Sequence, residues 1–446
     1  MSSSARGITG SRSGVPAFLK SPPRIVCLVT QLAVIAASIV ALWFWLPDTI
    51  DSWNEQRASD FPNFNGAARL AREGLGDRLY DRSREQDDEL QKFCGIPDDF
   101  LDEQLTFTGP GDACRALSGN FRSPPSLILF YLPGSFLSAE DAYHATFIVL
   151  AVCSLALAAW VASAFQSWPA RIAVFLGILA LPILQLGLRL SQPSAVYALA
   201  ILGGFAFDAR RMPGPAGLCF ALLSLKPQFL VLPLIYLAYR GSYRTVGWSV
   251  GISAALFVGG ALLIGPETLV DYVQLNINLL RHGPHPLQQA WMYNWQGFAL
   301  ALTGEPQRTA STLLAISTLL LLGVAWLRNP GPSAALTVAV GVLAVPYVLF
   351  YDWVLLAPAA ALAAGCLVGQ PARAWLGGVM LVVWAAIWAT HQSLPFFGSH
   401  TGELPDGEIY WSTLSLALAL IVAAVLFERS AARPAVRQEP VLAASD

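Results

Sequence analysis

Three charged residues stand out because each interrupts or borders a strongly apolar part of the chain. Asp60 follows the first long apolar run by a short distance, Lys226 interrupts the stretch LCFALLSLKPQFLVLPLIYL, and Asp352 lies between two aromatic residues. A carboxylate can accept the proton of an attacking hydroxyl, and the compact ammonium of a lysine is a natural partner for phosphate. These residue types therefore fit the transfer of a group from a phosphorylated donor to a hydroxyl acceptor.

Each of the three also has a purely structural interpretation. Asp60 precedes a stretch with one proline and the sequence NGAARLARE, so it is a plausible helix N-cap. Lys226, the only lysine after residue 92, could extend from a helix end to the membrane interface. Asp352 could be a solvated turn acid beside a belt of interfacial aromatic residues. The sequence leaves both interpretations open at each position.

Two further segments carry polar groups that suit a sugar or a phosphate. Arg189, Ser191 and Gln192 follow an apolar run and precede a proline, so they either bind substrate or form a plain turn with an interfacial arginine. The segment 281–296, RHGPHPLQQAWMYNWQ, combines aromatic rings with the amides of Asn294 and Gln296, which suits carbohydrate; interfacial anchoring is the alternative. Its two histidines are three residues apart, and no carboxylate motif supports a metal site there.

The composition places these residues in a membrane. The chain of 446 residues is 55% hydrophobic and 13% charged, with a mean hydropathy of +0.53, whereas soluble domains carry about 25% charged residues. No basic patch indicates nucleic-acid binding. No glycine-rich phosphate loop, dinucleotide fingerprint or nucleophile elbow is present. A nucleotide-sugar donor is therefore poorly supported, and a donor already in the membrane fits better.

The first apolar run and the segment after it set the expected layout. Residues 25–46 carry no charge and are long enough to cross a bilayer core of about 30 Å. The segment 47–123 then holds 16 of the 29 acidic residues, which predicts a large polar loop on one membrane face. Cys94 and Cys114 lie in this loop, and they either form a disulfide or remain free thiols.

The remaining apolar runs predict an all-α polytopic protein. They cover 124–137, 143–165, 170–188, 193–208, 214–225, 228–239, 246–264, 309–327, 333–350, 353–368, 374–390 and 411–427. The basic residues of the short linkers and of both termini fall on one side if the spans alternate, which predicts cytoplasmic termini. Residue 123 is expected outside and Arg210 inside, so an odd number of the four runs between them must cross the membrane. We expect the run that does not cross to be 170–188, which two arginines and a proline interrupt. The count is then about 12 spans.

The expected organisation has three parts. Residues 1–24 form a disordered basic tail on the cytoplasmic side, 25–427 the membrane domain, and 428–446 a second cytoplasmic tail. Within the membrane domain, 47–123 and 265–308 are the two large extracytoplasmic loops. The runs 214–225 and 228–239 form a hairpin, or a re-entrant pair, with Lys226 at its outer tip.

The order and spacing of several segments resemble the C-type integral membrane glycosyltransferases (GT-C). The segments are SDFPNFNGAARLAREG at 59–74, RSPPSLILFYLP at 122–133, RLSQPSAVYALAILGG at 189–204, LLSLKPQFLVLPLIYL at 222–237, NWQGFALAL at 294–302 and YDWVLLAPA at 351–359. Within that class the chain is most similar to glycosyltransferase family 87, a group of polyprenol-phosphate-mannose-dependent mannosyltransferases. The resemblance covers roughly residues 59–370.

The resemblance implies an inverting hexosyltransferase of the bacterial plasma membrane. Asp60 would be the general base, and Lys226, together with Arg189, would neutralise the departing polyprenyl phosphate. The sugar or acceptor would be held by Gln192, Asn294, Gln296, Asp352 and Arg122. The donor would be a polyprenyl-phosphate-linked sugar, the acceptor a lipid or glycan of the cell envelope, and no cofactor or metal would be required.

The sequence departs from the common family pattern at two places. An aromatic residue usually precedes the two prolines where this chain has Ser123, and a glycine often stands where it has Ser191. Two other functions remain as alternatives: a transporter or flippase of lipid-linked or envelope glycans, and a non-catalytic scaffold. No internal repeat supports the transporter, and the acids gather on one face rather than at mid-membrane, which favours interfacial chemistry.

Overall fold

The computed structural model describes residues 24–55, 60–80, 123–282, 292–328, 333–366, 372–393 and 413–419. These residues are almost entirely helical, and their only extended pairing is one isolated β-bridge between Met292 and Leu349. The predicted tails, the Cys94–Cys114 pair and Arg122 lie outside the described residues. The all-α prediction is confirmed for the part of the chain that the structure describes.

Four helices are long and apolar enough to cross a membrane. They are α1 (Arg24–Glu55), α6 (Ala139–Ser163), α12 (Tyr243–Ile264) and α16 (Arg308–Arg328). A bent pair, α7 (Trp168–Leu179) and α8 (Pro182–Arg189), gives a fifth candidate if it is one broken span. The count of about 12 spans remains a prediction, because the other apolar helical segments in the described residues do not reach the length and hydropathy of a full span.

Helix α1 continues beyond the predicted end of the first span. It passes through Pro47 and ends at Glu55, so the first part of the predicted loop 47–123 is helical. Partners in α8 hold this added portion: the Thr49 hydroxyl bonds to the amide oxygen of Gln185 at 3.0 Å, and Ser52 accepts a bond from Arg189 at 2.9 Å. Tertiary contacts therefore extend the helix past the point where its apolar run stops.

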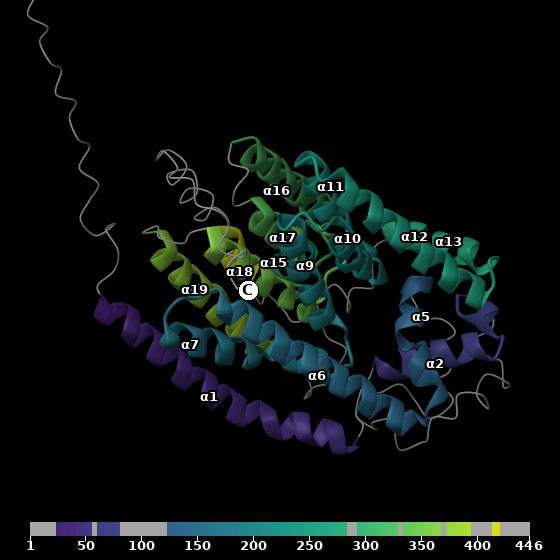
Figure 1. The fold of residues 1–446 in the computed structure, drawn as a ribbon, viewed down its shortest axis with the longest axis horizontal. Helices are drawn as coiled ribbons and strands as arrows, with labels where there is room; N and C mark the ends of the chain where they lie inside the picture. Colours follow the sequence, from purple (N-terminus) through teal and green to yellow (C-terminus); the bar gives the residue numbers. More distant parts are fainter. Residues whose placement is uncertain are drawn as a thin grey trace, which may run out of the picture.

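The α7–α8 pair runs alongside α1, which changes the expected course of residues 170–188. A Cβ added at Gly177 of α7 would lie 3.7 Å from the Val34 side chain of α1. At the other end of the pair, Arg189 of α8 bonds to Ser52 of α1. The pair thus follows about 18 residues of α1, or about 27 Å, nearly the thickness of a bilayer core. Its bend is 45°, and Figure 1 shows both helices beside α1. These contacts favour a broken span over the expected re-entrant loop.

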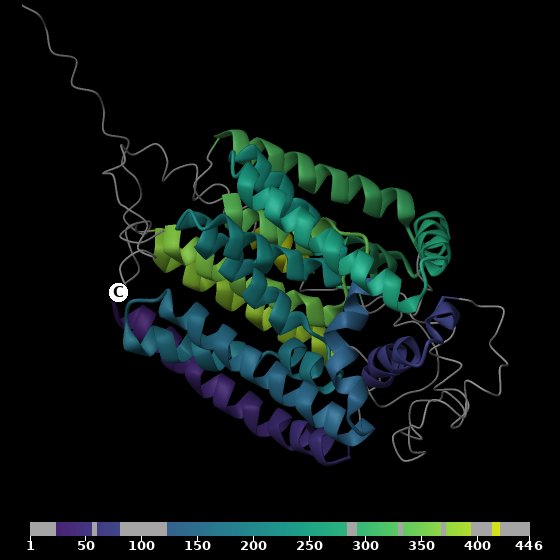
Figure 2. The same ribbon diagram turned by 45° about the vertical axis from the view of Figure 1, so that its right-hand side comes forward.

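The run 124–137 is the one that stays at one end of the molecule. It forms α5 (Pro125–Tyr131) and η5 (Leu132–Phe136), which pack on α2 (Phe61–Arg72) and on α12 near Gly260. A Cβ at Gly260 would lie 2.3 Å from the carbonyl oxygen of Pro125, so only glycine permits this approach. Figures 1 and 2 place α2 and α5 together at the end of the bundle where α1 finishes. The number of crossings between residue 123 and Arg210 must be odd, and it is odd if α5–η5, rather than 170–188, does not cross the membrane.

Two short hairpins meet in the interior. The first contains α10 (Pro213–Ala221), η6 (Leu222–Leu225), η7 (Pro227–Phe229) and α11 (Val231–Tyr239); the second contains α17 (Ser333–Ala344), η8 (Phe350–Leu355) and α18 (Leu356–Cys366). Lys226 lies at the tip of the first hairpin and Asp352 at the tip of the second. Lys226 has extended backbone angles (φ −143°, ψ 76°) because the following proline disfavours the helical conformation.

The remaining elements complete the bundle. They are η2 (Gly76–Arg78), α9 (Ser194–Ala209), α13 (Thr268–His282), α15 (Trp295–Thr303) and α19 (Ala372–Ser393), with a further short helical segment at 413–419. Two of them, α13 and α15, lie in the predicted loop 265–308, so that loop is largely helical. The core is continuous from α2 and α5 through α9 to η8 and α18.

Candidate active site

Asp60 occupies the first position before α2, but its carboxylate does not cap that helix. The backbone carbonyl of Asp60 accepts a bond from the Phe64 amide at 3.2 Å, whereas its side chain makes no capping bond. The carboxylate instead accepts a hydrogen bond from the Nε2 atom of Gln192 at 2.6 Å. The N-cap interpretation is therefore correct for the backbone and wrong for the side chain.

The surroundings of Asp60 favour a carboxyl group that can exchange a proton. Burial raises the pKa of Asp60 above its ordinary value, while the Gln192 hydrogen bond and the positive charge of Lys226 act in the opposite direction, and burial is the larger effect. A carboxylate with a raised pKa is a stronger base than a free aspartate. Part of the Asp60 residue is exposed, whereas its carboxyl group is buried.

Lys226 and Asp352 form a buried ion pair between the hairpin tips. The Lys226 ammonium lies 2.7 Å and 2.8 Å from the two carboxylate oxygens of Asp352. Its Nζ atom is also 4.8 Å from the centre of the Tyr351 ring, a cation–π distance. The lysine side chain is 15% exposed. Lys226 thus points into the protein toward a partner and does not extend to the interface.

Asp352 is held by three separate donors. Besides Lys226, the Ser194 hydroxyl donates to Oδ1 at 3.2 Å and the Leu349 amide donates to Oδ2 at 3.1 Å. The side chain has no exposed surface. The alternative that it is a solvated turn acid is therefore wrong. Its predicted contact with sugar stays untested, and the geometry gives it a structural partner first.

Arg189 lies at the end of α8, on the side that faces α1. Its Nε atom bonds to the Ser52 hydroxyl at 2.9 Å, and its Nη1 atom is 3.4 Å from the carboxylate of Asp48. Asp48 is 53% exposed, so this ion pair is weak. The bonds of Arg189 to Ser52 and Asp48 direct it toward α1. Its role at the donor phosphate remains a prediction.

The two amides of the segment 294–296 have different surroundings. Asn294 caps α15: its Oδ1 accepts from the amides of Gln296 and Gly297, and its Nδ2 donates to the carbonyls of Val345 and Pro346. All of its polar capacity thus goes to the backbone, which links α15 to the turn before η8. The Oε1 atom of Gln296 is buried and has no hydrogen-bond partner. Of the two, Gln296 retains the capacity for a further contact.

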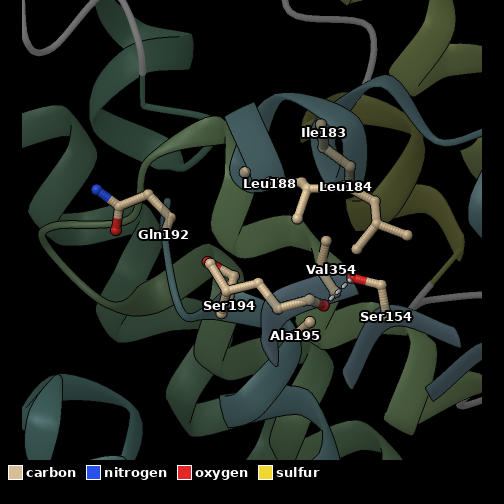
Figure 3. Close-up of a pocket in the computed structure, with 10 residues that line it drawn as sticks. Ser154, Ile183, Leu184, Leu188, Gln192, Ser194, Ala195 and Val354 are labelled. Atoms are coloured by element: carbon tan, nitrogen blue, oxygen red, sulfur yellow. Dashed lines mark hydrogen bonds between the residues drawn. The ribbon is translucent and has the colours of Figure 1, made fainter. Parts of the chain in front are cut away.

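A small pocket lies behind the acids, between α6, α8, α9 and η8. Its wall is mainly apolar, with Gln192 and Ser194 at one side. Figure 3 shows the Gln192 amide pointing away from this wall, and Ser194 lying within it. The space of about 10 Å³ holds about one water molecule. A hexose does not fit, so we assign no substrate to this pocket.

Two residues of the site, Tyr131 and Ser194, were not predicted from the sequence. The Tyr131 hydroxyl donates to the Ser191 carbonyl at 2.6 Å, and Ser194 supports Asp352. Ser191 has a left-handed backbone (φ 57°), a conformation that favours glycine. Tyr131 and Ser194 resemble ordinary core residues of apolar runs, but Ser191 was detectable as a departure from the family pattern. Within the described residues, no group of three or more His, Cys, Asp or Glu side chains could hold a metal ion.

Comparison with known proteins gives one match. The model of glycosyltransferase family 87 matches residues 121–351, just over half of the chain. The matched region contains Arg189, Gln192 and Lys226 and ends one residue before Asp352, whereas Asp60 lies outside it. No curated protein and no solved structure matches the chain.

Proposed function

This chain belongs to glycosyltransferase family 87 and is a membrane glycosyltransferase; from that premise we propose that it transfers a hexose from a polyprenyl-phosphate sugar to a hydroxyl of a lipid or glycan acceptor. The hexose is mannose by analogy with the family. The observation that supports this most directly is the Asp60 carboxylate, which turns away from the helix that it precedes and accepts a bond from Gln192.

In the proposed reaction, Asp60 accepts the proton of the acceptor hydroxyl. The acceptor oxygen then forms a bond to the anomeric carbon while the bond from that carbon to the phosphate oxygen breaks. The polyprenyl phosphate leaves with the bonding electrons, and the configuration at the anomeric carbon is inverted. General-base catalysis of this kind contributes typically 10²–10⁴-fold to the rate.

Lys226 would stabilise the negative charge that develops on the leaving phosphate. Its ammonium is close enough to Asp60 to act on the pKa of that carboxyl, so both groups can face one reacting centre. The phosphate must share the ammonium with Asp352, which already binds it through both oxygens. A preorganised cation in a desolvated site stabilises developing charge more strongly than one in water. Arg189, Gln296 and Arg122 remain proposed substrate contacts.

The reaction would take place at the outer face of a bacterial plasma membrane, with both termini in the cytoplasm. Single cysteines introduced into a cysteine-free background test this arrangement. Glu305, between α15 and α16, and Met212, between α9 and α10, are both exposed. Glu305→Cys should react with an impermeant maleimide in intact cells, and Met212→Cys only after lysis. The reverse pattern would contradict the proposed side.

The donor class is tested by a transfer assay. Membranes that contain the protein are given a radiolabelled hexose either on polyprenyl phosphate or on a nucleotide diphosphate, in both cases in detergent, so that transport of the donor across a membrane is not required. We expect label to reach a lipid or glycan product only from the polyprenyl phosphate donor. Label transferred from the nucleotide sugar alone would refute the donor assignment. No transfer from either donor would favour a transporter or scaffold.

A further inference from the structure

The catalytic base proposed above lies in a closed ring of contacts between three separate segments. Phe64, one turn into α2, stacks on the Tyr131 ring of α5 with the ring centres 5.0 Å apart. The Tyr131 hydroxyl bonds to the Ser191 carbonyl, and the next residue, Gln192, bonds to Asp60. The ring closes because the Phe64 amide donates to the Asp60 carbonyl. Figure 1 shows α2 and α5 side by side.

The turn that carries Gln192 is under conformational strain. Ser191 has φ of 57°, a left-handed conformation that is unfavourable for a residue with a Cβ. Its hydroxyl is also buried without a hydrogen-bond partner. The backbone N–H of Gln192 closes the turn by donating to the Gly187 carbonyl at 2.7 Å. Ser191 thus takes the left-handed position that commonly ends a helix, here α8, and this turn sets where the next residue, the partner of the proposed base, lies.

We propose that Tyr131 is a positioning residue for Asp60, which it holds in place through the Ser191–Gln192 turn. The inference rests on the proposed function of Asp60. The tyrosine hydroxyl fixes the Ser191 carbonyl at 2.6 Å, and this holds the strained turn so that the Gln192 amide points at the Asp60 carboxylate. The stacked Phe64 ring keeps Tyr131 aligned with the helix that Asp60 begins.

The groups around Asp60 allow the effect of Tyr131 to be separated from other charges. The titratable side chains that act on or are affected by Asp60 are Lys226, Tyr131 and Tyr351. Tyr131→Phe leaves the charge of Lys226 and the ring of Tyr351 unchanged and removes one hydroxyl. A change in the acid limb of the pH–rate profile then reflects either the geometry of the Gln192–Asp60 bond or the loss of the hydroxyl itself, and a Gln192→Leu background separates the two.

A double-mutant cycle tests the proposal. Tyr131→Phe keeps the stacked ring, and we expect kcat/KM to fall on the order of tenfold, less than the about 100-fold that a 1 Å misplacement costs. Its acid limb should move to higher pH, because the carboxylate loses part of the hydrogen bond that stabilises it. In a Gln192→Leu background the same change should lower kcat/KM by less than about twofold, since the connection is already broken.

Tyr80→Phe is the matched control. The Tyr80 hydroxyl, also on a buried side chain, donates to the Ser123 carbonyl at 2.7 Å, but it does not touch the turn. The Tyr80→Phe variant should lose similar stability, but the acid limb of its pH–rate profile should not move. Equal effects of Tyr131→Phe in both backgrounds, or effects no larger than those of Tyr80→Phe, would overturn the positioning role. Normal turnover in Asp60→Asn would instead refute the proposed function, so the two failures are distinguishable.

Discussion

The carboxyl groups of the two acids of the site are both buried, but their hydrogen-bond partners differ. Asp60 lies before α2 and has a neutral amide as its hydrogen-bond partner. Asp352 lies at the hairpin tip, is fully buried, and bonds to a lysine, a serine and a backbone amide. A carboxylate beside a neutral donor can take up a proton, whereas one that neutralises a buried cation is needed in its charged form. The same side chain therefore suits a base at one position and a counter-ion at the other.

The comparison assigns roles that residue type alone does not. Pairs of carboxyl groups whose environments differ are the usual sign of divided roles in catalysis. Asp60 would accept the proton, and Asp352 would hold Lys226 charged and correctly placed for the phosphate. The predictions below test each half of this division, beginning with the largest expected effect on stability.

Breaking the ion pair on one side should be strongly destabilising. Lys226→Met leaves the Asp352 carboxylate buried without its cation, and Asp352→Leu leaves the ammonium unpaired. Each should lower the free energy of unfolding by about 3–5 kcal/mol. Thermal unfolding in detergent would measure this, as would the yield of folded protein.

The double variant separates stability from function. Replacing both partners, with Lys226→Met and Asp352→Leu together, removes both buried charges and should restore most of the stability. Donor binding should still be weakened, because the Lys226 ammonium proposed to contact the phosphate is absent. A double variant that is stable and binds polyprenyl-phosphate sugar normally would remove Lys226 from the donor site.

The pH dependence of transfer should reflect the environment of Asp60. Burial raises its pKa, so the carboxyl group takes up a proton at a higher pH than a free aspartate does, and kcat/KM should fall as the pH drops through that raised pKa. Gln192→Leu removes a hydrogen bond that favours the charged form. The acid limb should then move to still higher pH. An acid limb that does not move in Gln192→Leu would show that Gln192 does not influence the base.

Strain at Ser191 should give the smallest effect. Ser191→Gly relieves the left-handed conformation but also increases the freedom of the unfolded chain, so the gain in stability should be no more than about 1 kcal/mol. Arg211 has the same conformation, with φ of 58°, in a turn away from the site, and Arg211→Gly is the control. Both variants should be slightly more stable, which thermal unfolding in detergent would measure.

The long helices were predictable from sequence, and the pairing of the site residues was not. The apolar runs 246–264 and 309–327 predict α12 and α16 within three residues, because lipid contact selects uninterrupted apolar helices. The added turns of α1 were missed because Thr49 and Ser52 depend on partners in α8. The contacts of 170–188 with α1 were not predictable for the same reason, and whether this run crosses the membrane stays a prediction.

Asp60, Lys226, Gln192 and Asp352 could each be selected from the sequence because a polar group in an apolar context is unusual. Their pairing could not, because Lys226 and Asp352 are 126 residues apart and one sequence carries no information on contacts between hairpins. Asn294 was assigned to sugar because an amide near aromatic rings suits carbohydrate. Its cap of α15 is local, through the amides of Gln296 and Gly297, but its bonds to the Val345 and Pro346 carbonyls depend on the fold.

The central claim is that Asp60 is the general base, and turnover of Asp60→Asn tests it most directly. Asparagine keeps the size of the side chain and its capacity to accept a bond from Gln192, but it cannot take up the proton of the acceptor. With polyprenyl-phosphate hexose as donor, we expect kcat to fall by about 10²–10⁴-fold, with donor affinity and unfolding temperature close to those of the unmodified protein. Near-normal turnover in this variant would contradict the account.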